Sequence, residues 1–136
     1  MNSSSDPRGA RPLAPPRRCI LVVEDELLIR VLLCEELREA GYDVIEAFNA
    51  DEALAVLQSP VCVDMIVSDV RMPGSMDGMA LLRVVKQTLP AIPVIITSAH
   101  LPPMLATVDG AALFIAKPYR VETVLKAVED ELGKNP

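Results

Sequence analysis

Short aliphatic runs alternate along this chain with longer segments of helical periodicity, and this alternation limits the folds that the chain can adopt. The runs are rich in Val, Ile and Leu and are bounded by turn residues, which is typical of buried strands. They cover residues 20–23, 43–47, 65–68, 93–97 and 113–116. Helical patterns cover residues 27–39, 50–57, 79–89 and 121–132, and the second opens on a capping-box pattern at 49–52. Strands that alternate with helices predict an α/β fold with a parallel sheet and right-handed crossovers.

The alternation is weakest between Ala99 and Gly110, where Pro102 and Pro103 stand at the start of any fourth helix. Proline disrupts a helix because it lacks an N–H and its ring clashes with the preceding turn, so we expect this helix to be short or irregular. Residues 1–17 are rich in Ser, Pro and Arg, with almost nothing to bury. We therefore expect a flexible tail there, one folded unit over residues 18–133, and a short C-terminal end at 134–136.

The net charge of −6 is unevenly distributed along the chain. Residues 1–18 contain four arginines and one aspartate, a net charge of +3, so the rest of the chain carries −9. A folded unit this acidic argues against nucleic acid as a direct partner. No apolar run approaches the roughly 18 residues of a membrane span, and the N-terminal residues lack the pattern of a signal peptide. We expect a cytoplasmic protein that does not bind membranes.

Three cysteines, Cys19, Cys34 and Cys62, lie amid apolar neighbours and lack the spacing of a metal site. We expect Cys19 and Cys62 in strands and Cys34 in a helix, all three as buried free thiols. Aromatic residues make up only 3% of the chain, so the core that surrounds these thiols should be aliphatic.

Polar side chains follow four of the expected strands at the point where each strand ends. Glu24 and Asp25 follow the first strand, Asp69 the third, Ser98 the fourth and Lys117 the fifth. The carboxyl ends of parallel strands meet at one edge of the sheet, where three carboxylates would repel one another unless a cation offsets them. Mg²⁺ prefers such oxygen ligands, and a lysine and a hydroxyl suit phosphoryl oxygens. The pattern therefore indicates a carboxylate nucleophile, Asp69, that forms an acyl phosphate.

Each of these residues also has a purely structural explanation. Glu24 and Asp25 favour a helix N-terminus, an effect worth less than about 1 kcal/mol, and Asp69 is of a type common in turns. Ser98 is explained as a turn residue and Lys117 as a surface lysine at a strand end. Taken together these explanations fail, because independent accidents would have to fall on four strand ends in matching order.

The motifs at these strand ends resemble the receiver domain of bacterial two-component response regulators. The resemblance covers about residues 19–132, and it implies a flavodoxin-like, doubly wound five-stranded parallel sheet of strand order 2-1-3-4-5. The motifs are Val22-Val23-Glu24-Asp25-Glu26, Ser68-Asp69-Val70-Arg71-Met72-Pro73-Gly74, Met76-Asp77-Gly78, Pro93-Val94-Ile95-Ile96-Thr97-Ser98-Ala99 and Ala116-Lys117-Pro118-Tyr119. The acidic pair is Glu-Asp rather than the commoner Asp-Asp, and the loop after Asp69 has one residue more than usual.

The resemblance implies a role for each residue of the acidic site. Asp69 becomes the phosphoacceptor and a ligand of Mg²⁺ or Mn²⁺. Asp25 becomes the main metal ligand, Glu24 its neighbour acting directly or through water, and Arg71 a ligand through its main-chain carbonyl. Lys117 becomes the lysine that pairs with the phosphoryl group.

The resemblance also implies the switch residues. Ser98 rather than Thr97 becomes the switch hydroxyl because it lies five residues after Pro93, and Phe114 becomes the aromatic side chain that moves with it, although an ordinary core role explains Phe114 equally well. Arg71 and His100 fall at the two positions that tune the lifetime of the phosphoryl group. We expect these large side chains to crowd the attacking water.

The helical pattern at residues 27–39 carries more apolar residues than one buried stripe requires. Part of this surface should be exposed, and the resemblance makes a histidine kinase or a histidine phosphotransfer domain the natural partner there. A slightly apolar helix without a partner is the alternative. Because the chain ends soon after Leu132, we expect a stand-alone receiver that acts on a further, unknown protein.

Two other functions remain open beside the phosphorylated switch. One is a binding adaptor with a receiver fold that signals without phosphorylation. The other, less favoured, is a small phosphatase. Such enzymes carry a second Asp two residues after the first, whereas this chain has Arg71 at that position. His100 is the only histidine, and the chain has no Gly-rich nucleotide loop. We therefore expect no enzyme that turns over an outside substrate.

Overall fold

The computed structural model describes residues 17–71, 74, 76–99 and 110–133, and its centre is a five-stranded parallel sheet of order β2-β1-β3-β4-β5. The strands are β1 (Cys19–Val23), β2 (Asp43–Ala47), β3 (Met65–Asp69), β4 (Val94–Ser98) and β5 (Leu113–Ala116). In the described residues, four helices flank it: α1 (Leu27–Glu39), α2 (Ala50–Gln58), α3 (Gly78–Thr88) and α5 (Val121–Gly133). The predicted α/β fold and its strand order are confirmed.

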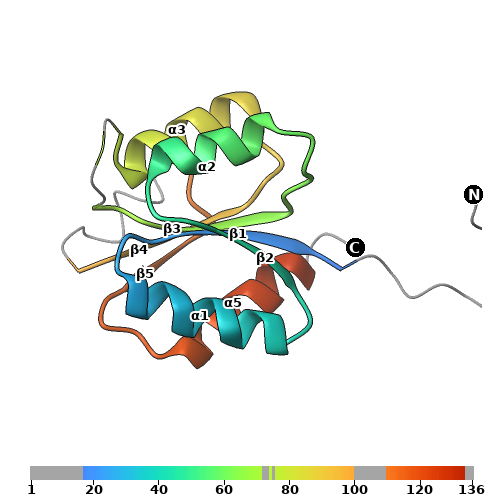
Figure 1. Ribbon diagram of the computed structural model, residues 1–136, viewed down its shortest axis with the longest axis vertical. Coiled ribbons are helices and arrows are strands. Elements are labelled where there is room, and N and C mark those ends of the chain that lie inside the picture. The colour runs from blue at the N-terminus through green and yellow to red at the C-terminus, as the bar shows by residue number, and fades with distance from the viewer. Residues whose placement is uncertain (1–16, 72–73, 75, 100–109, 134–136) are drawn as a thin grey trace, which may run out of the picture.

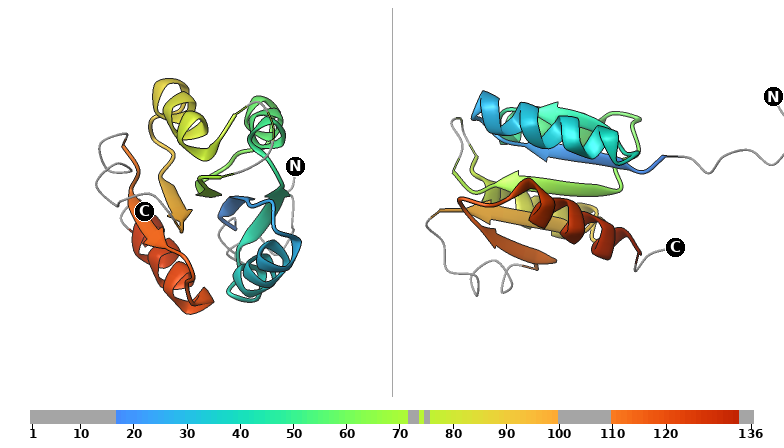
Figure 2. Two further views of the ribbon diagram at one scale, coloured as in Figure 1. Left: turned by 90° about the vertical axis from the view of Figure 1, so that its left-hand side faces the viewer. Right: turned by 90° about the horizontal axis from the view of Figure 1, so that it is seen from below.

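The helices form one layer on each face of the sheet. Helices α2 and α3 cover one face, and α1 and α5 cover the other (Figure 1). The left view of Figure 2 shows the same layers from the edge at which the strands end, and the right view looks onto α1 and α5 in front of the sheet. Because both faces are covered, the strands β1, β3 and β4 are buried almost throughout, as their continuous aliphatic sequences predict.

The core consists of two aliphatic clusters separated by the sheet. Successive residues of a strand point to opposite faces, so Leu21 and Val23 pack toward α2 and α3, while Ile20 and Val22 pack toward α1 and α5. Each cluster excludes water from one face of β1. The end of β1 is therefore held between the α2–α3 layer and the α1–α5 layer, and the acidic residues follow directly after it.

Side chains cap the two helices on the α2–α3 face. The Asn49 side chain accepts a hydrogen bond from the Glu52 N–H at 2.8 Å, as the predicted capping box requires. The reciprocal bond differs: the Glu52 carboxylate accepts from the N–H of Phe48, at 2.8 Å, rather than from Asn49. Asp77 caps α3 by accepting from the Ala80 N–H at 2.9 Å, which fixes the start of α3 directly after the loop that follows β3.

Three details differ from the expectations. Strand β3 includes Asp69, and β4 covers Val94–Ser98 instead of residues 93–97, so Ser98 is its last residue. Cys34 is buried in α1 as predicted, and Cys19 begins β1 but is only half-buried. The prediction for Cys62 is wrong, since this cysteine is exposed and precedes β3. The Asp64 carboxylate accepts the Cys19 N–H at 2.7 Å, and Val61 and Cys62, just before it, are exposed.

The expected tail up to Arg17, the weak fourth helix and the C-terminal end lie largely outside the described residues. Within the described ranges, no helix combines the length and the apolar character that crossing a membrane would require.

Candidate functional site

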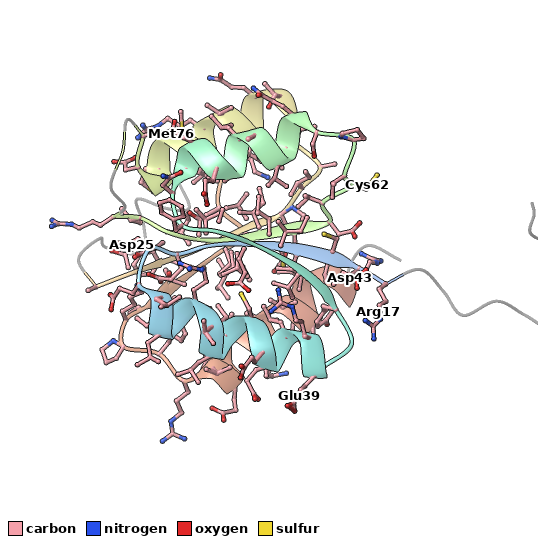
Figure 3. The ribbon with its side chains drawn as sticks, viewed as in Figure 1. Arg17, Asp25, Glu39, Asp43, Cys62 and Met76 are labelled. Carbon is pink, nitrogen blue, oxygen red and sulfur yellow. The ribbon has the colours of Figure 1, made fainter. Side chains whose placement is uncertain are left out.

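The register of the sheet brings the strand ends together at one edge. Val23 of β1 pairs with Ser68 of β3, Asp69 pairs with Thr97 of β4, and Ser98 pairs with Ala116 of β5. The residues that end or directly follow β1, β3, β4 and β5 therefore share one edge of the sheet, as the sequence pattern predicts. Figure 3 shows Asp25 at this edge and Asp43 and Cys62 at the opposite end of the sheet.

Lys117 joins the two buried carboxylates of the site. Its Nζ lies 2.9 Å from Glu24 Oε1 and 2.9 Å from Asp69 Oδ2, and its side chain is only 13% exposed. Burial lowers the pKa of Lys117, but the hydrogen bonds to Glu24 and Asp69 outweigh this effect, so that the net shift of its pKa is upward. Lys117 therefore stays protonated and partly neutralises the carboxylates in the absence of a metal ion.

Glu24 is held by hydrogen bonds at both of its carboxylate oxygens. Oε1 accepts from Lys117, and Oε2 accepts from the N–H of Glu26 at 3.0 Å, at the start of α1. Burial raises the pKa of Glu24, although the bond from Lys117 opposes this shift. Glu24 thus links β1, the N-terminus of α1 and the lysine after β5.

One carboxylate oxygen of Asp69 accepts a hydrogen bond from Lys117, and the other accepts one from the next residue, Val70. Oδ1 accepts from the Val70 N–H at 2.8 Å, and the residue is only 7% exposed. The Val70 N–H also donates to the carbonyl of Thr97 at 3.1 Å, so the main chain after Asp69 is tied to β4. These bonds hold the carboxylate in one orientation at the edge of the sheet.

A polar cavity of about 230 Å³ opens above these side chains. It is lined by Asp25, Glu26, Asp69, Arg71, Ser98, Ala99 and Lys117. Within the described residues, Glu24, Asp25 and Asp69 each offer one carboxylate oxygen, and these three atoms lie within 4.8 Å of one another. Hard oxygen donors at this spacing fit a divalent cation such as Mg²⁺. The Asp25 side chain is exposed, so a cation could reach the donors from solvent.

The remaining predicted residues lie at different distances from this cavity. Ser98 is 2% exposed and lines the cavity, whereas Thr97 is buried and does not line it. Phe114 is half-buried and packs against the core cluster on the α2–α3 face. Arg71 is exposed at the rim. His100 lies outside the described residues.

Gly78 is a residue whose part in the site the sequence reasoning missed. Its N–H donates to the carbonyl of Val70 at 2.8 Å, and a Cβ at this position would overlap the carbonyl of Asp69. Only glycine allows the start of α3 to approach β3 so closely. The signal in the sequence was the Met76-Asp77-Gly78 motif, to which no steric role was assigned.

The prediction that α1 exposes part of its apolar surface is confirmed. Leu27 is 64% exposed, Leu28 72% and Leu32 51%, whereas Leu33 and Leu37 are buried against the sheet. A larger cavity of about 450 Å³ adjoins this surface and reaches Lys117. It is lined by Glu26, Ile29, Leu32, Ala99, Lys117, Pro118, Tyr119 and Val121.

A doubly wound sheet with an acidic cavity and a bridging lysine at the carboxyl ends of its strands defines the receiver class. The chain belongs to the response regulator receiver domain family, whose sequence pattern it matches over residues 20–129. It is 39% identical over 116 residues to the DNA-binding transcriptional regulator NtrC of Salmonella typhimurium. That match covers 83% of this chain and 24% of NtrC. The chain therefore spans about a quarter of that relative.

Other relatives agree with this assignment. The transcriptional regulatory protein PdtaR of Mycobacterium tuberculosis is 36% identical over 121 residues, covering 85% of this chain and 57% of PdtaR. Among solved structures, the receiver domain of NtrX from Brucella abortus is 35% identical with a TM-score of 0.77, covering 84% of this chain and 98% of that one. A CheY-like receiver domain from Methanospirillum hungatei supports the fold, with a TM-score of 0.81 and 24% identity. This match covers 88% of this chain and 96% of that one.

Proposed function

We propose that Asp69 accepts a phosphoryl group from a phosphohistidine of a histidine kinase or a histidine phosphotransfer domain, in a reaction that depends on Mg²⁺ or Mn²⁺. The observation that carries this proposal is the placement of Asp69 between Lys117 and the cluster of carboxylates, in a polar cavity open to a donor. Membership of the receiver family supports the same chemistry, since phosphorylation-based signalling is general to that family.

In the proposed reaction a carboxylate oxygen of Asp69 attacks phosphorus while the N–P bond of the donor breaks. The new bond is an acyl phosphate, and the electron pair of the broken bond stays on the imidazole nitrogen. Asp25, Asp69, Glu24 (directly or through water) and the main-chain carbonyl of Arg71 would hold the metal ion, which supplies charge neutralisation to the phosphoryl oxygens.

Lys117 and Ser98 then serve the transferred group. The Lys117 ammonium exchanges one carboxylate for a phosphoryl oxygen, and the Ser98 hydroxyl donates to another. Ser98 ends β4 and pairs with Ala116, two residues after Phe114, so its displacement would be transmitted to Phe114 and would bias a two-state surface. Asp69 would later lose the phosphoryl group to water, so no outside substrate is turned over.

Arg71 and His100 would set the lifetime of the phosphoryl group by crowding the attacking water. The position of Arg71 at the cavity rim supports its part of this proposal. We expect Arg71→Ala and His100→Ala to lose the phosphoryl group faster than the parent protein, as measured by intact mass over time after removal of the donor. Loss at the parent rate in both variants would contradict this role.

The exposed leucines of α1 support a docking site for the phosphoryl donor. Leu32 lines the apolar cavity that reaches Lys117, and Leu27 and Leu28 are exposed on the same helix. Because Lys117 is paired with Asp69, a partner seated over this cavity would lie beside Asp69. We further propose that residues 18–133 suffice for this function, that it operates in the cytoplasm, and that a separate protein reads the phosphorylated state.

The test is to incubate the protein with Mg²⁺ and a small acyl-phosphate donor and to measure its intact mass. We expect the gain of one phosphoryl group, which is lost in Asp69→Ala and after chelation of the metal. Asp130→Ala, which removes an exposed carboxylate of α5, is the matched control and should still be labelled. If the folded parent protein binds Mg²⁺ but gains no phosphoryl group, the phosphorylation proposal fails and the adaptor function is favoured.

A further inference from the structure

Arg30 of α1 holds the main chain of the acidic turn. Its guanidinium donates through one terminal nitrogen to the carbonyl oxygen of Glu24 at 2.8 Å and through Nε to Glu46 Oε1 at 3.1 Å. Glu46 belongs to β2, and the Arg30 side chain is only 15% exposed. A planar guanidinium that makes two such bonds is fixed in orientation, which a flexible ammonium would not be.

Strand β2 fixes the same residue from its other side. The N–H of Glu24 donates to the carbonyl of Ala47 at 3.0 Å, and Ala47 directly follows Glu46. Both main-chain polar groups of Glu24 are therefore bonded, the N–H to β2 directly and the carbonyl to β2 through Arg30. Asp25, the exposed carboxylate of the cavity, is the next residue, so the orientation of its main chain depends on the peptide group that Arg30 holds.

We propose that Arg30, anchored by Glu46, is a positioning residue that orients the Glu24–Asp25 turn for binding of a divalent cation. The inference rests on the proposed metal site and adds to it a residue that contacts neither the metal nor the phosphoryl group. Groups that orient metal ligands typically change metal affinity by about 10- to 100-fold when removed. Arg30 bonds to the main-chain carbonyl of Glu24, and it would therefore act on the metal only through the carboxylates of Glu24 and Asp25.

Positioning and simple electrostatics predict opposite results at Arg30. Removing a positive charge close to the carboxylates would, by Coulomb's law alone, tighten the binding of Mg²⁺. If Arg30 positions the turn, its removal weakens that binding instead. The sign of the change therefore separates the two effects.

Arg38 provides a matched control. It donates to the other oxygen of the same carboxylate, Glu46 Oε2, at 3.1 Å, and to the carbonyl of Val44 at 3.2 Å, without a bond to Glu24. Arg38→Met thus removes the same charge and an ion pair of the same Glu46 from the same helix. The Arg38 side chain is 46% exposed, so the loss of its ion pair should cost less than about 1 kcal/mol of stability.

The experiment measures the Kd of Mg²⁺ by titration calorimetry in the full chain without a phosphoryl donor. We expect Arg30→Met to raise this Kd about tenfold and Arg38→Met to leave it within about twofold of the parent value. With an acyl-phosphate donor, Arg30→Met should raise the Mg²⁺ concentration for half-maximal labelling by a similar factor, while the labelling rate at saturating Mg²⁺ stays within about twofold. A general structural defect would lower that saturated rate as well.

An unchanged or lower Kd in Arg30→Met would overturn the proposal, as would an equal rise in both variants. Arg30→Lys is the second variant if Arg30→Met does not fold: it keeps the charge but lacks the planar fork, and we expect a rise of several-fold. A Kd for Arg30→Lys equal to that of the parent would likewise overturn the positioning role. Failure of the parent protein itself to bind Mg²⁺ would instead contradict the proposed metal site.

Discussion

A single lysine holds two buried carboxylates of this site at the same distance. Glu24 and Asp69 come from different strands, and Lys117 lies between them with both ion pairs at 2.9 Å. Removal of one partner from a buried ion-pair network leaves uncompensated charge, which typically costs about 3–5 kcal/mol. The stability of the metal-free protein should therefore depend on this lysine.

We predict that Lys117→Met lowers the free energy of unfolding by about 3 kcal/mol in the absence of divalent cations. Mg²⁺ neutralises the same carboxylates, so it should raise the Tm of Lys117→Met more than that of the parent. The measurement is thermal unfolding with and without Mg²⁺. Lys126→Met is the control, since the Lys126 side chain is 77% exposed in its pair with Asp130 and should matter little. An equal effect of Mg²⁺ on parent and Lys117→Met would count against this account.

Gly78 supplies a steric prediction at the same scale. In Gly78→Ala the new Cβ would overlap the carbonyl of Asp69, so the start of α3 or the end of β3 must move. We expect a loss of about 1–3 kcal/mol in urea unfolding, together with weaker Mg²⁺ binding. Gly133→Ala is the matched control, because a Cβ there meets nothing within 4 Å, and it should be neutral or slightly stabilising. Equal stabilities of the two variants would refute the steric argument.

The placement of Asp69, Ser98 and Lys117 around one cavity was predictable from the sequence, but the contact that Arg30 makes behind it was not. Asp69, Ser98 and Lys117 were predictable because each falls at or directly after the end of an aliphatic run, and parallel strands bring such ends together. The bond from Arg30 to the carbonyl of Glu24 was not predictable, because it depends on the distance between α1 and β2 and on the rotamer of a long side chain.

At the scale of elements, the bounds of α1, β2 and β5 agree with the patterns, while other ends differ by about one residue. The end of α1 was predictable because residues 27–39 are followed by Gly41, whose φ of 102° lets the chain leave the helix. Cys62 was placed wrongly because a short apolar segment indicates burial only where a neighbouring strand covers it. Cys62 is exposed because β3 begins only at Met65, three residues further along the chain.

The exposed apolar surface of α1 carries a prediction for the element as a whole. Leu28→Glu, at a side chain that is 72% exposed, should change stability by less than about 0.5 kcal/mol. It should slow phosphotransfer from the histidine-phosphorylated donor about tenfold, while labelling by a small acyl phosphate stays normal. Val61→Glu, in the loop before β3, changes an equally apolar side chain that is 47% exposed and should affect neither reaction. Transfer to Leu28→Glu at the parent rate would exclude docking on α1.

The whole molecule combines an aliphatic two-layer core with ionisable groups placed inside it. Alternating runs predict a parallel α/β sheet, but the strand order came from the resemblance, since periodicity alone does not say which strands are neighbours. The register of that sheet then determines which groups become buried. Burial raises the pKa of Cys34 to about 12, and burial followed by the charge of Glu24 raises that of Tyr119 to about 12.

These raised pKa values predict a loss of stability at alkaline pH. Cys34 and Tyr119 stay protonated in the folded protein but ionise in the unfolded chain above their ordinary pKa values of 9.0 and 10.0. Their contribution is complete below those values and declines as the pH rises toward the folded pKa, with a slope of up to about 1.4 kcal/mol per pH unit for each group. Urea unfolding between about pH 9 and pH 11 measures this decline. Cys34→Ala should show a smaller slope, and an unchanged slope would contradict the assignment to Cys34.

We propose that the strand ends form one site in which Asp69, and no other carboxylate, receives the phosphoryl group. The most direct measurement is to phosphorylate the protein with an acyl-phosphate donor and Mg²⁺, to reduce the acyl phosphate with borohydride, and to locate the modified residue by peptide mass spectrometry. We predict a single modified position, Asp69. Modification at Glu24 or Asp25, or spread over exposed carboxylates, would contradict the account.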